Sequence, residues 1–382
     1  MVKKRLALLG ATGSIGLSTL QVIREQSDKF EIVLATAHHK SRELFQIAKE
    51  FQIPRLVLTD KQIQAANPEL PTGTKVYYGE EELVRLLQGA EYDIALNAIS
   101  GSAGLRSTMA ILETGRDLAL ANKESLVMAG HLVKDLQAKH GSQILPVDSE
   151  HSAIFQAIGG LPVSEIATVH LTASGGAFRT LPLLDFDKIT VEQALRHPNW
   201  DMGAKVTLDS ATMFNKALEV MEAHWLFNLD WAQIKAVIHP QSVIHSMVEF
   251  VDGSFLAQMS LPDMMLPILY ALSYPKRFVS KLVQTNPLEL PALTFEDIDP
   301  KRYPLFFLGV EAGKKGGIMP TVVNAANEAA LKLFIEKKIG FNQIVNVVDA
   351  AVQKAINIDR PDLETILAYN KQSYNAALTF SK

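Results

Sequence analysis

The chain has 382 residues, of which 48% are hydrophobic and 20% charged, with a net charge of −4 and no cysteine. This composition is typical of a globular protein of two or three domains, and it provides no overall basic field for nucleic acid or an anionic membrane. The lack of cysteine excludes disulfides, thiolate metal ligands, iron–sulfur clusters and a cysteine nucleophile. The first apolar run is too short for a signal peptide and no run is long enough to span a membrane, so we expect a cytoplasmic protein.

Short apolar runs alternate with helical patterns over the first 150 residues. We expect strands at residues 5–9, 31–36, 55–58, 75–78, 93–98, 117–121 and 143–147, and helices between several of them, for example at 41–51 and 80–88. This alternation predicts an α/β fold with a Rossmann-like, doubly wound, mainly parallel sheet. Such sheets bind ligands beyond the carboxyl ends of their strands.

The remainder of the chain has a different pattern. Strand-like runs at 166–172, 236–238, 242–248 and 254–259 mix with a helical pattern near 211–227, which predicts an α+β region. Residues 274–303 are rich in proline and irregular, as in a linker. From residue 304 the pattern is mostly helical, with expected helices at 324–337, 341–356 and 363–377.

The first strand leads into a glycine-rich turn, within "LALLGATGSIGLSTLQVI". Gly10, Gly13 and Gly16 permit a tight turn and close approach of the backbone, and the helix that follows offers free N–H groups to a pyrophosphate. The alternative is an ordinary glycine-rich turn between a strand and a helix. Because this turn opens the first strand–helix unit of an α/β region, it favours nucleotide binding.

The second strand ends in "ATAHHKSRE". An NAD site usually carries an acidic residue there to hold the ribose 2′-hydroxyl. Here His38, His39, Lys40 and Arg42 replace it, and cations suit a 2′-phosphate. The sequence therefore favours NADP(H) over NAD, with a solvated basic turn as the alternative.

Two carboxylates follow the last strand of this region, in "LPVDSEHSAIFQ". If the segment is extended, Asp148 and Glu150 point the same way and could together bind Mg²⁺ or Mn²⁺. Alternatively, Asp148 or Ser149 caps a helix that begins near Ser152, with Glu150 in its first turn. No role is evident for the neighbouring histidine.

A third carboxylate could come from "LDSATMFNKALEVMEAHW". In a helix, Asn215, Lys216 and Glu219 share one face, with Glu222 one turn further on. Such a face could serve a phosphate and a metal together, or it could be a solvated face with routine Lys–Glu pairing. Periodicity does not choose between Glu219 and Glu222.

Three more segments carry polar residues outside the expected strands. In "LTASGGAFR", the Ser-Gly-Gly sequence at 174–176 could bind an anion or form a simple turn. The segment "RHPNWDMGAK" suggests a lid, unless Trp200 pins it to the core. In "LALANKESLV", Lys123 could act near a metal-bound carbonyl, whereas Asn122 could merely cap a helix.

Together these features indicate a reduced nicotinamide cofactor, a divalent metal and a small phosphorylated substrate. Two reactions fit: oxidative decarboxylation of a hydroxy acid, or carbon rearrangement followed by hydride transfer. A module that senses NADP(H) without catalysis is the alternative outside the enzymes.

The motifs "GATGSIG", "LANKESLV", "PVDSEHSAIFQ", "TASGGAFR", "HPNWDMGAKVTLDSATMFNKALEVMEA" and "HPQSVIHSMVEFVDGS" resemble the 1-deoxy-D-xylulose 5-phosphate reductoisomerase family. The resemblance implies a metal-assisted retro-aldol and aldol rearrangement, then reduction by NADPH, to 2-C-methyl-D-erythritol 4-phosphate in non-mevalonate isoprenoid biosynthesis. It also implies a homodimer. The family commonly has Gly-x-Asn at the end of the second strand, and this chain departs from that with Ala37-His38-His39.

The resemblance also implies roles for individual residues. The NADPH contacts are Thr12, Gly13, Ser14, Ile15, Ala37, His38, His39, Asn122, Glu124 and Gly203. One Mg²⁺ or Mn²⁺ ion is held by Asp148, Glu150 and Glu219, which with Lys123 form the catalytic set; Glu219 is thereby favoured over Glu222. The substrate contacts are Lys123, Ser149, Glu150, Ser174, His197, Trp200, Ser210, Asn215, Lys216 and Glu219.

These roles suggest a division of the chain. We expect an NADPH-binding Rossmann-like domain at 1–148 and a catalytic α+β domain at 149–273, with a flap at 196–205. A linker at 274–303 and a C-terminal helical bundle domain at 304–382 follow.

Overall fold

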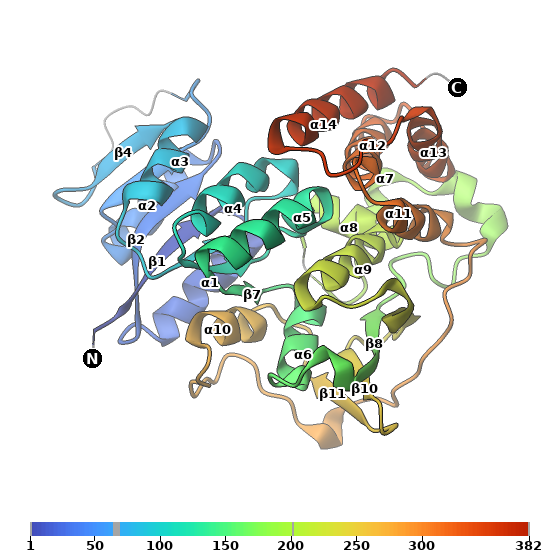
Figure 1. Ribbon diagram of the computed structural model, residues 1–382, viewed down its shortest axis with the longest axis horizontal. Helices are drawn as coiled ribbons and strands as arrows, with labels where there is room; N and C mark the ends of the chain where they lie inside the picture. Colours follow the sequence, from blue (N-terminus) through green and yellow to red (C-terminus); the bar gives the residue numbers. More distant parts are fainter. Residues whose placement is uncertain (1, 64–68, 201, 381–382) are drawn as a thin grey trace. The chain divides into compact units, whose positions relative to one another are not determined.

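The computed structural model describes residues 2–63, 69–200 and 202–380, and the chain forms two compact units (Figure 1). The first unit comprises residues 1–125, 133–152 and 263–284, and the second comprises 126–132, 153–262 and 285–382. Among the described residues, no helix combines the length and the apolar character that spanning a membrane requires.

The first unit is built on a seven-stranded parallel sheet. Its strands are β1 (Lys4–Leu9), β2 (Phe30–Ala37), β3 (Arg55–Leu58), β4 (Lys75–Tyr78), β5 (Ile94–Asn97), β6 (Asp117–Leu120) and β7 (Ile144–Pro146). They lie in the order β4-β3-β2-β1-β5-β6-β7, all parallel. All seven strands predicted from the sequence are confirmed, with ends that differ by no more than one residue.

Helices connect these strands and cover the sheet. They are α1 (Ser14–Glu25), α2 (Ser41–Phe51), α3 (Glu80–Gly89), α4 (Leu105–Leu112) and α5 (Lys123–His140), with α10 (Met265–Ser273) joining from later in the chain. Helix α6 (Ser149–Ile158) follows β7, and its residues from Ala153, like residues 126–132 of α5, are part of the second unit. The central strand β1 is fully buried from Leu6 to Leu9, as expected for a parallel strand covered on both faces. The strand order reverses between β1 and β5, which is where doubly wound sheets bind their ligands.

The second unit contains a four-stranded mixed sheet. Its strands are β8 (Ile166–Ala173), β9 (Ile234–Ile238), β10 (Ile244–Phe250) and β11 (Phe255–Met259), in the order β11-β10-β8-β9. Only the β8–β9 pair is parallel. β11 is an edge strand, and its residues Phe255 and Leu256 are each 51% exposed.

Helices make up the remainder of the second unit. They are α7 (Val191–Ala194), α8 (Ala204–Ala211), α9 (Phe214–Phe227), α11 (Pro304–Lys315), α12 (Met319–Ile335), α13 (Ile344–Lys354) and α14 (Leu363–Leu378). Helix α9 packs on β8 and β9, and α12 packs against α11, α13 and α14 (Figure 1). The predicted α+β region and helical C-terminal region are confirmed.

Two features of the fold were not indicated by the sequence. The helical pattern near 211–227 is interrupted, because Met213 takes a left-handed conformation (φ 61°) between α8 and α9. Residues 263–284 pack with the first unit, where α10 contacts α1, β6 and β7. The expected division into three domains and a linker stays a prediction.

Candidate functional site

The glycine-rich turn of the first unit brings the end of β1 close to the end of β5. Gly10 has a φ of +82°, and a Cβ atom there would lie 2.7 Å from the carbonyl oxygen of Ala98. A Cβ atom on Gly16 would lie 2.3 Å from the carbonyl oxygen of Gly10. Glycine is therefore required at both positions if the turn and α1 are to stay this close.

The amino end of α1 has the character of an anion site. Gly13 occupies the N-cap position, no side chain caps the helix, and its first turn contains no acidic residue. Thr12 and Ile15 are half-buried, and Gly13 and Ser14 are exposed. The first N–H groups of α1 are thus available to a pyrophosphate, so the turn fits the predicted dinucleotide.

A basic turn follows β2. Ala37 is buried, whereas His38, His39 and Lys40 are exposed. The Nδ1 atom of His38 lies 2.9 Å from the hydroxyl of Thr59, and the backbone N–H of Asp60 donates to the carbonyl of His38 at 3.2 Å. The turn offers cations to a ligand, with one acidic residue nearby at the end of β3.

Asn122 caps α5, as one of the two interpretations of the sequence predicted. Its Oδ1 atom accepts from the backbone N–H of Ser125 at 3.0 Å. Its Nδ2 atom donates to the carbonyls of Ile99 at 2.6 Å and Gly101 at 2.8 Å, and to the carboxylate of Glu124 at 3.1 Å. Asn122 thus ties the end of β6 to the segment after β5, next to the glycine-rich turn.

The carboxylates after β7 lie at the start of a helix, not in an extended segment. Helix α6 begins at Ser149, three residues earlier than the alternative assumed, and Glu150 lies in its first turn. Asp148 precedes the helix and accepts from the backbone N–H of Ser149 at 3.0 Å. The expectation of extended geometry at 148–150 is therefore wrong. Asp148 thus lies directly before the first turn of α6, and its side chain bonds to the first backbone N–H of the helix.

Lysine and hydroxyl groups surround these carboxylates within the first unit. The ammonium of Lys123 lies 2.5 Å from Oδ2 of Asp148, and the hydroxyl of Ser149 donates to Glu150 at 2.5 Å. The Nδ1 atom of His151, which is fully buried, lies 3.8 Å from Oδ2 of Asp148. This set of oxygen donors suits a hard divalent cation, so the residues fit the predicted metal.

In the second unit, a glycine brings two of the predicted substrate residues together. Gly176 has a φ of +69°, and a Cβ atom there would lie 2.5 Å from the carbonyl oxygen of Ser210. The turn that follows β8 can therefore contact α8 only with glycine at this position. As a result, Ser174 and Ser210 lie on either side of one imidazole, that of His197.

His197 connects these serines to the flap. Its Nε2 atom lies 3.0 Å from the hydroxyl of Ser174 and 3.1 Å from that of Ser210. Its Nδ1 atom accepts from the backbone N–H groups of Asn199 and Trp200, at 3.1 and 3.0 Å. Because Nδ1 accepts, the proton of the neutral ring is on Nε2 and points at the serines. Burial lowers the pKa of His197 to about 4, so the ring is neutral at pH 7.

Helix α9 carries the remaining predicted substrate residues. Lys216 forms an ion pair with Glu219, and Asn215 also donates to Glu219. Lys216, Glu219 and Glu222 are all buried, at 3%, 0% and 0% exposure. The alternative of a solvated helix face is therefore wrong. Charged groups buried to this extent are retained where they have partners or a function.

The described residues of the predicted flap before α8, 196–200 and 202–203, are irregular. Trp200 is half-buried, with its ring 6.0 Å from that of His245, so it is not pinned in the core. Gly203 is the exposed N-cap residue of α8. Asp201 lies outside the described residues.

Several residues that support the turn after β8 and helix α8 were missed by the sequence reasoning. The hydroxyl of Tyr303 donates to the carbonyl of Gly175 at 2.8 Å, and burial raises the pKa of Tyr303 to about 12. Asp209 is buried and accepts from Lys205 at 2.9 Å and Asn327 at 2.6 Å, which fixes α8. The contacts of Tyr303 with Gly175 and of Asn327 with Asp209 join residues far apart along the chain, so no local pattern signals them.

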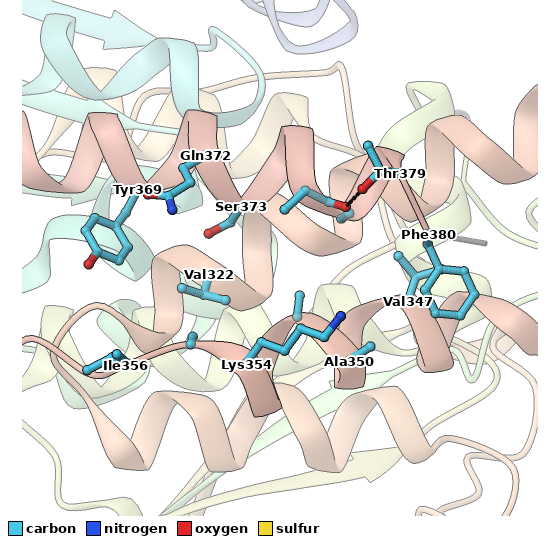
Figure 2. Close-up of a pocket in the computed structure, with 14 residues that line it drawn as sticks. Val322, Val347, Ala350, Lys354, Ile356, Tyr369, Gln372, Ser373, Thr379 and Phe380 are labelled. Atoms are coloured by element: carbon cyan, nitrogen blue, oxygen red, sulfur yellow. Dashed lines mark hydrogen bonds between the residues drawn. The ribbon is translucent and has the colours of Figure 1, made fainter. Parts of the chain in front are cut away.

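The second unit also contains a groove of about 430 Å³ among α12, α13 and α14 (Figure 2). Figure 2 shows mostly small and apolar side chains there, among them Val322, Val347 and Ala350. None of the predicted site residues lines the groove, so we do not assign the chemistry to it.

A doubly wound sheet with a glycine-rich turn at the point of strand reversal defines a dinucleotide-binding α/β protein of the Rossmann class. Comparison with known families is more specific. Residues 6–130 match the family described as 1-deoxy-D-xylulose 5-phosphate reductoisomerase, residues 144–227 match a C-terminal domain of that enzyme, and residues 259–376 match a further DXP reductoisomerase C-terminal domain. The chain belongs to the 1-deoxy-D-xylulose 5-phosphate reductoisomerase family.

Similar proteins cover the full length of the chain. It is 45% identical to the 1-deoxy-D-xylulose 5-phosphate reductoisomerase of Halalkalibacterium halodurans, over 97% of each chain. A solved reductoisomerase from Zymomonas mobilis in complex with NADPH has a TM-score of 0.91 at 38% identity, over 99% of this chain and 98% of that one. A DOX-P reductoisomerase in complex with NADPH, fosmidomycin and magnesium has a TM-score of 0.93 at 37% identity, over 98% and 97%.

Proposed function

We propose that this chain catalyses the rearrangement and NADPH-dependent reduction of 1-deoxy-D-xylulose 5-phosphate to 2-C-methyl-D-erythritol 4-phosphate, with one Mg²⁺ or Mn²⁺ ion per active site. The observation that carries the proposal is similarity to reductoisomerases along nearly the whole chain. The glycine-rich turn, the carboxylates after β7 and the serine–histidine pocket all lie within the matched segments. We assign the step to non-mevalonate isoprenoid biosynthesis.

NADPH is assigned to the carboxyl edge of the parallel sheet. The uncapped amino end of α1 supports a pyrophosphate contact by Thr12, Gly13, Ser14 and Ile15. The basic turn at 37–40 supports a contact with the 2′-phosphate. We also assign Asn122, Glu124 and Gly203 to cofactor contacts.

The divalent cation is assigned to Asp148, Glu150 and Glu219. Asp148 and Glu150 belong to the first unit and Glu219 to the second. Each unit also supplies an ammonium: Lys123 beside Asp148, and Lys216 beside Glu219. These lysines limit the repulsion that concentrated carboxylates would otherwise produce.

The substrate is assigned to both sets of polar residues. We place its phosphate against Ser174, Ser210, Asn215 and Lys216, where hydroxyl, amide and ammonium donors are all available. A neutral His197 supplies an N–H donor and does not lose a proton on binding. We assign Lys123, Ser149, Glu150 and Trp200 to the part of the substrate that reacts.

The chemistry divides between bound groups and the chain. When bound, the metal stabilises negative charge on substrate oxygens and NADPH supplies hydride. The chain orients the substrate. Its contacts with the substrate phosphate lie away from the reacting carbons, and the binding energy of these contacts favours one pose of the substrate. Lys123, which contacts Asp148, holds positive charge beside the assigned oxygens.

We also propose a cytoplasmic homodimer that binds neither nucleic acid nor membranes. The edge strand β11 supports self-association, because Phe255, Leu256 and Met259 are 51%, 51% and 43% exposed. An exposed apolar edge strand favours pairing with another strand. Sedimentation at several concentrations tests the dimer, and a Leu256→Lys variant is expected to shift it towards monomer.

The proposed activity is tested by following NADPH oxidation with 1-deoxy-D-xylulose 5-phosphate, with Mg²⁺, with Mn²⁺ and with chelator. We expect turnover only with metal. Absence of turnover at saturating metal and cofactor would contradict the proposal. A hydroxy-acid decarboxylase would instead release carbon dioxide from a hydroxy acid, and a sensing module would bind NADPH without consuming it.

A further inference from the structure

Asn199 is an exposed residue with two side-chain contacts to a distant loop. Its Nδ2 atom donates to the carbonyl of Pro240 at 2.7 Å and to the hydroxyl of Ser242 at 3.0 Å. Both partners belong to residues 239–243, which connect β9 to β10 and which we name the His239 loop. Asn199 is thus attached by its side chain to a segment some forty residues away in sequence.

The His239 loop is held by its own histidine. His239 is fully buried, and its Nε2 atom accepts from the backbone N–H groups of Val243 at 3.3 Å and Ile244 at 3.2 Å. Its Nδ1 atom therefore carries the proton and donates to the carbonyl of Thr294 at 2.9 Å. The ring stacks on Phe295, with a centroid distance of 4.9 Å. The side chain of His239 therefore fixes the loop, because it bonds both to the backbone that follows it in the chain and to the distant residue Thr294.

The same loop adjoins the substrate pocket. The backbone N–H of His239 donates to the carbonyl of Ala173 at 2.6 Å, immediately before Ser174. Ser242 takes a left-handed conformation (φ 53°). This conformation costs free energy for a residue with a side chain and persists only where the surrounding structure holds it. This conformation places the hydroxyl of Ser242 at Asn199.

Asn199 also connects back to the pocket through its backbone. Its N–H, like that of Trp200, donates to Nδ1 of His197, while Nε2 of His197 contacts the two serines. The ring of Trp200 lies against that of His245, whose Nε2 atom is 2.9 Å from the hydroxyl of Ser260. Residues 197–200 therefore join the pocket to the His239 loop.

We propose that Asn199 is a positioning residue, which fixes residues 197–200 on the His239 loop and so places Trp200 and His197 for substrate binding. This role rests on the proposed function, because its effect on affinity assumes the assigned substrate. The contacts themselves do not depend on the substrate, so they can be tested separately.

The first test uses protein labelled with 5-fluorotryptophan. The three tryptophans give three ¹⁹F signals, and a Trp200→Phe variant assigns the one from Trp200. We expect Asn199→Ala to shift or broaden that signal and to leave the other two in place. Asn286→Ala is the matched control, because Asn286 is also exposed and bonds only to nearby residues. An unchanged Trp200 signal in Asn199→Ala overturns the proposal.

The second test is a double-mutant cycle on substrate affinity. We expect Asn199→Ala to raise KM for 1-deoxy-D-xylulose 5-phosphate about fivefold to tenfold, as for loss of one hydrogen-bonded anchor, with kcat changed less than KM. Ser242→Ala is expected to have a smaller effect, and the double variant to match Asn199→Ala alone. Additive effects would overturn the proposal. If the unmodified enzyme does not turn over this substrate, the proposed function fails, while the ¹⁹F result still decides the role of Asn199.

Discussion

The two units contribute different kinds of chemical group to the candidate site. In the first unit, the cofactor region consists mainly of backbone groups at strand ends and at the amino end of α1, made accessible by Gly10 and Gly16. In the second unit, the residues assigned to the substrate are side chains from the turn after β8, from the segment before α8 and from α8 itself, centred on His197. Backbone sites follow from topology, whereas side-chain sites depend on particular long-range contacts. The two regions should therefore respond differently to substitution.

The largest effect is expected where the metal carboxylates lie. Glu150→Gln removes one assigned ligand charge at the start of α6 and should reduce turnover by roughly a hundredfold or more. NADPH affinity, measured by fluorescence titration, should stay the same because the cofactor region is separate. Glu165→Gln, at an exposed site, is the control. Turnover within threefold of the parent would remove Glu150 from the metal site.

Paired glycine substitutions test the contrast between the units directly. Gly16→Ala should weaken NADPH binding, and Gly176→Ala should raise KM for the substrate, each by at least about tenfold, because each new Cβ atom meets backbone. Gly89→Ala is the control, because a Cβ atom there meets nothing within 4 Å. Titration and steady-state kinetics separate the two effects. If both variants damage both affinities equally, the two regions are not independent.

A smaller effect is expected at the basic turn after β2. Replacing His38 and Lys40 by Ala should weaken NADPH about fivefold to tenfold, because two cationic or hydrogen-bonding groups near the 2′-phosphate are lost. NADH affinity should change little, because NADH lacks that phosphate. Dissociation constants for both cofactors, with Arg42→Ala for comparison, provide the measurement. Equal losses would show that the turn does not read the 2′-phosphate.

The last effect is on stability and depends on pH. His197 has a pKa of about 4 in the folded protein against 6.5 as the ordinary value, so the unfolded chain binds its proton first as the pH falls. The stability that neutral His197 contributes is full above about pH 6.5 and is lost towards pH 4. Relative to His197→Gln, the free energy of unfolding should fall by about 1 to 2 kcal/mol over that range after allowance for solvent screening. Denaturant titrations at several pH values measure it, and a constant difference would contradict it.

The sequence predicted the first unit well, because its signals are local. Hydrophobic runs indicate the buried strands, and the glycines at 10, 13 and 16 mark the turn between the first strand and the first helix. The carboxylates at 148 and 150 were placed at the correct strand end, yet their backbone was wrongly expected to be extended. The helix starts at Ser149, so both carboxylates still lie at the end of the strand although the segment is helical. In the sequence, a metal site and a helix start were alternative interpretations of this segment.

The second unit was predicted less completely, because its site depends on distant partners. The residue pattern pointed to Ser174 as part of a possible anion site, whereas His197 and Ser210 were assigned only through resemblance to a family. It did not indicate that Gly176 permits their contact, or that Tyr303 fixes the turn between them. No local pattern in the sequence signals either contact, because each one joins residues from separate segments of the chain. The left-handed Met213 between α8 and α9 was missed for the same reason.

Transfer of label from NADPH to product tests the central claim most directly, because it requires the cofactor, metal and substrate regions to act together. The protein would be incubated with 1-deoxy-D-xylulose 5-phosphate, Mg²⁺ and NADPH deuterated at the transferable position, and the product analysed by mass spectrometry. We predict 2-C-methyl-D-erythritol 4-phosphate carrying one deuterium, formed only when metal is present. Product without deuterium, or the same product in the presence of chelator, would contradict the account.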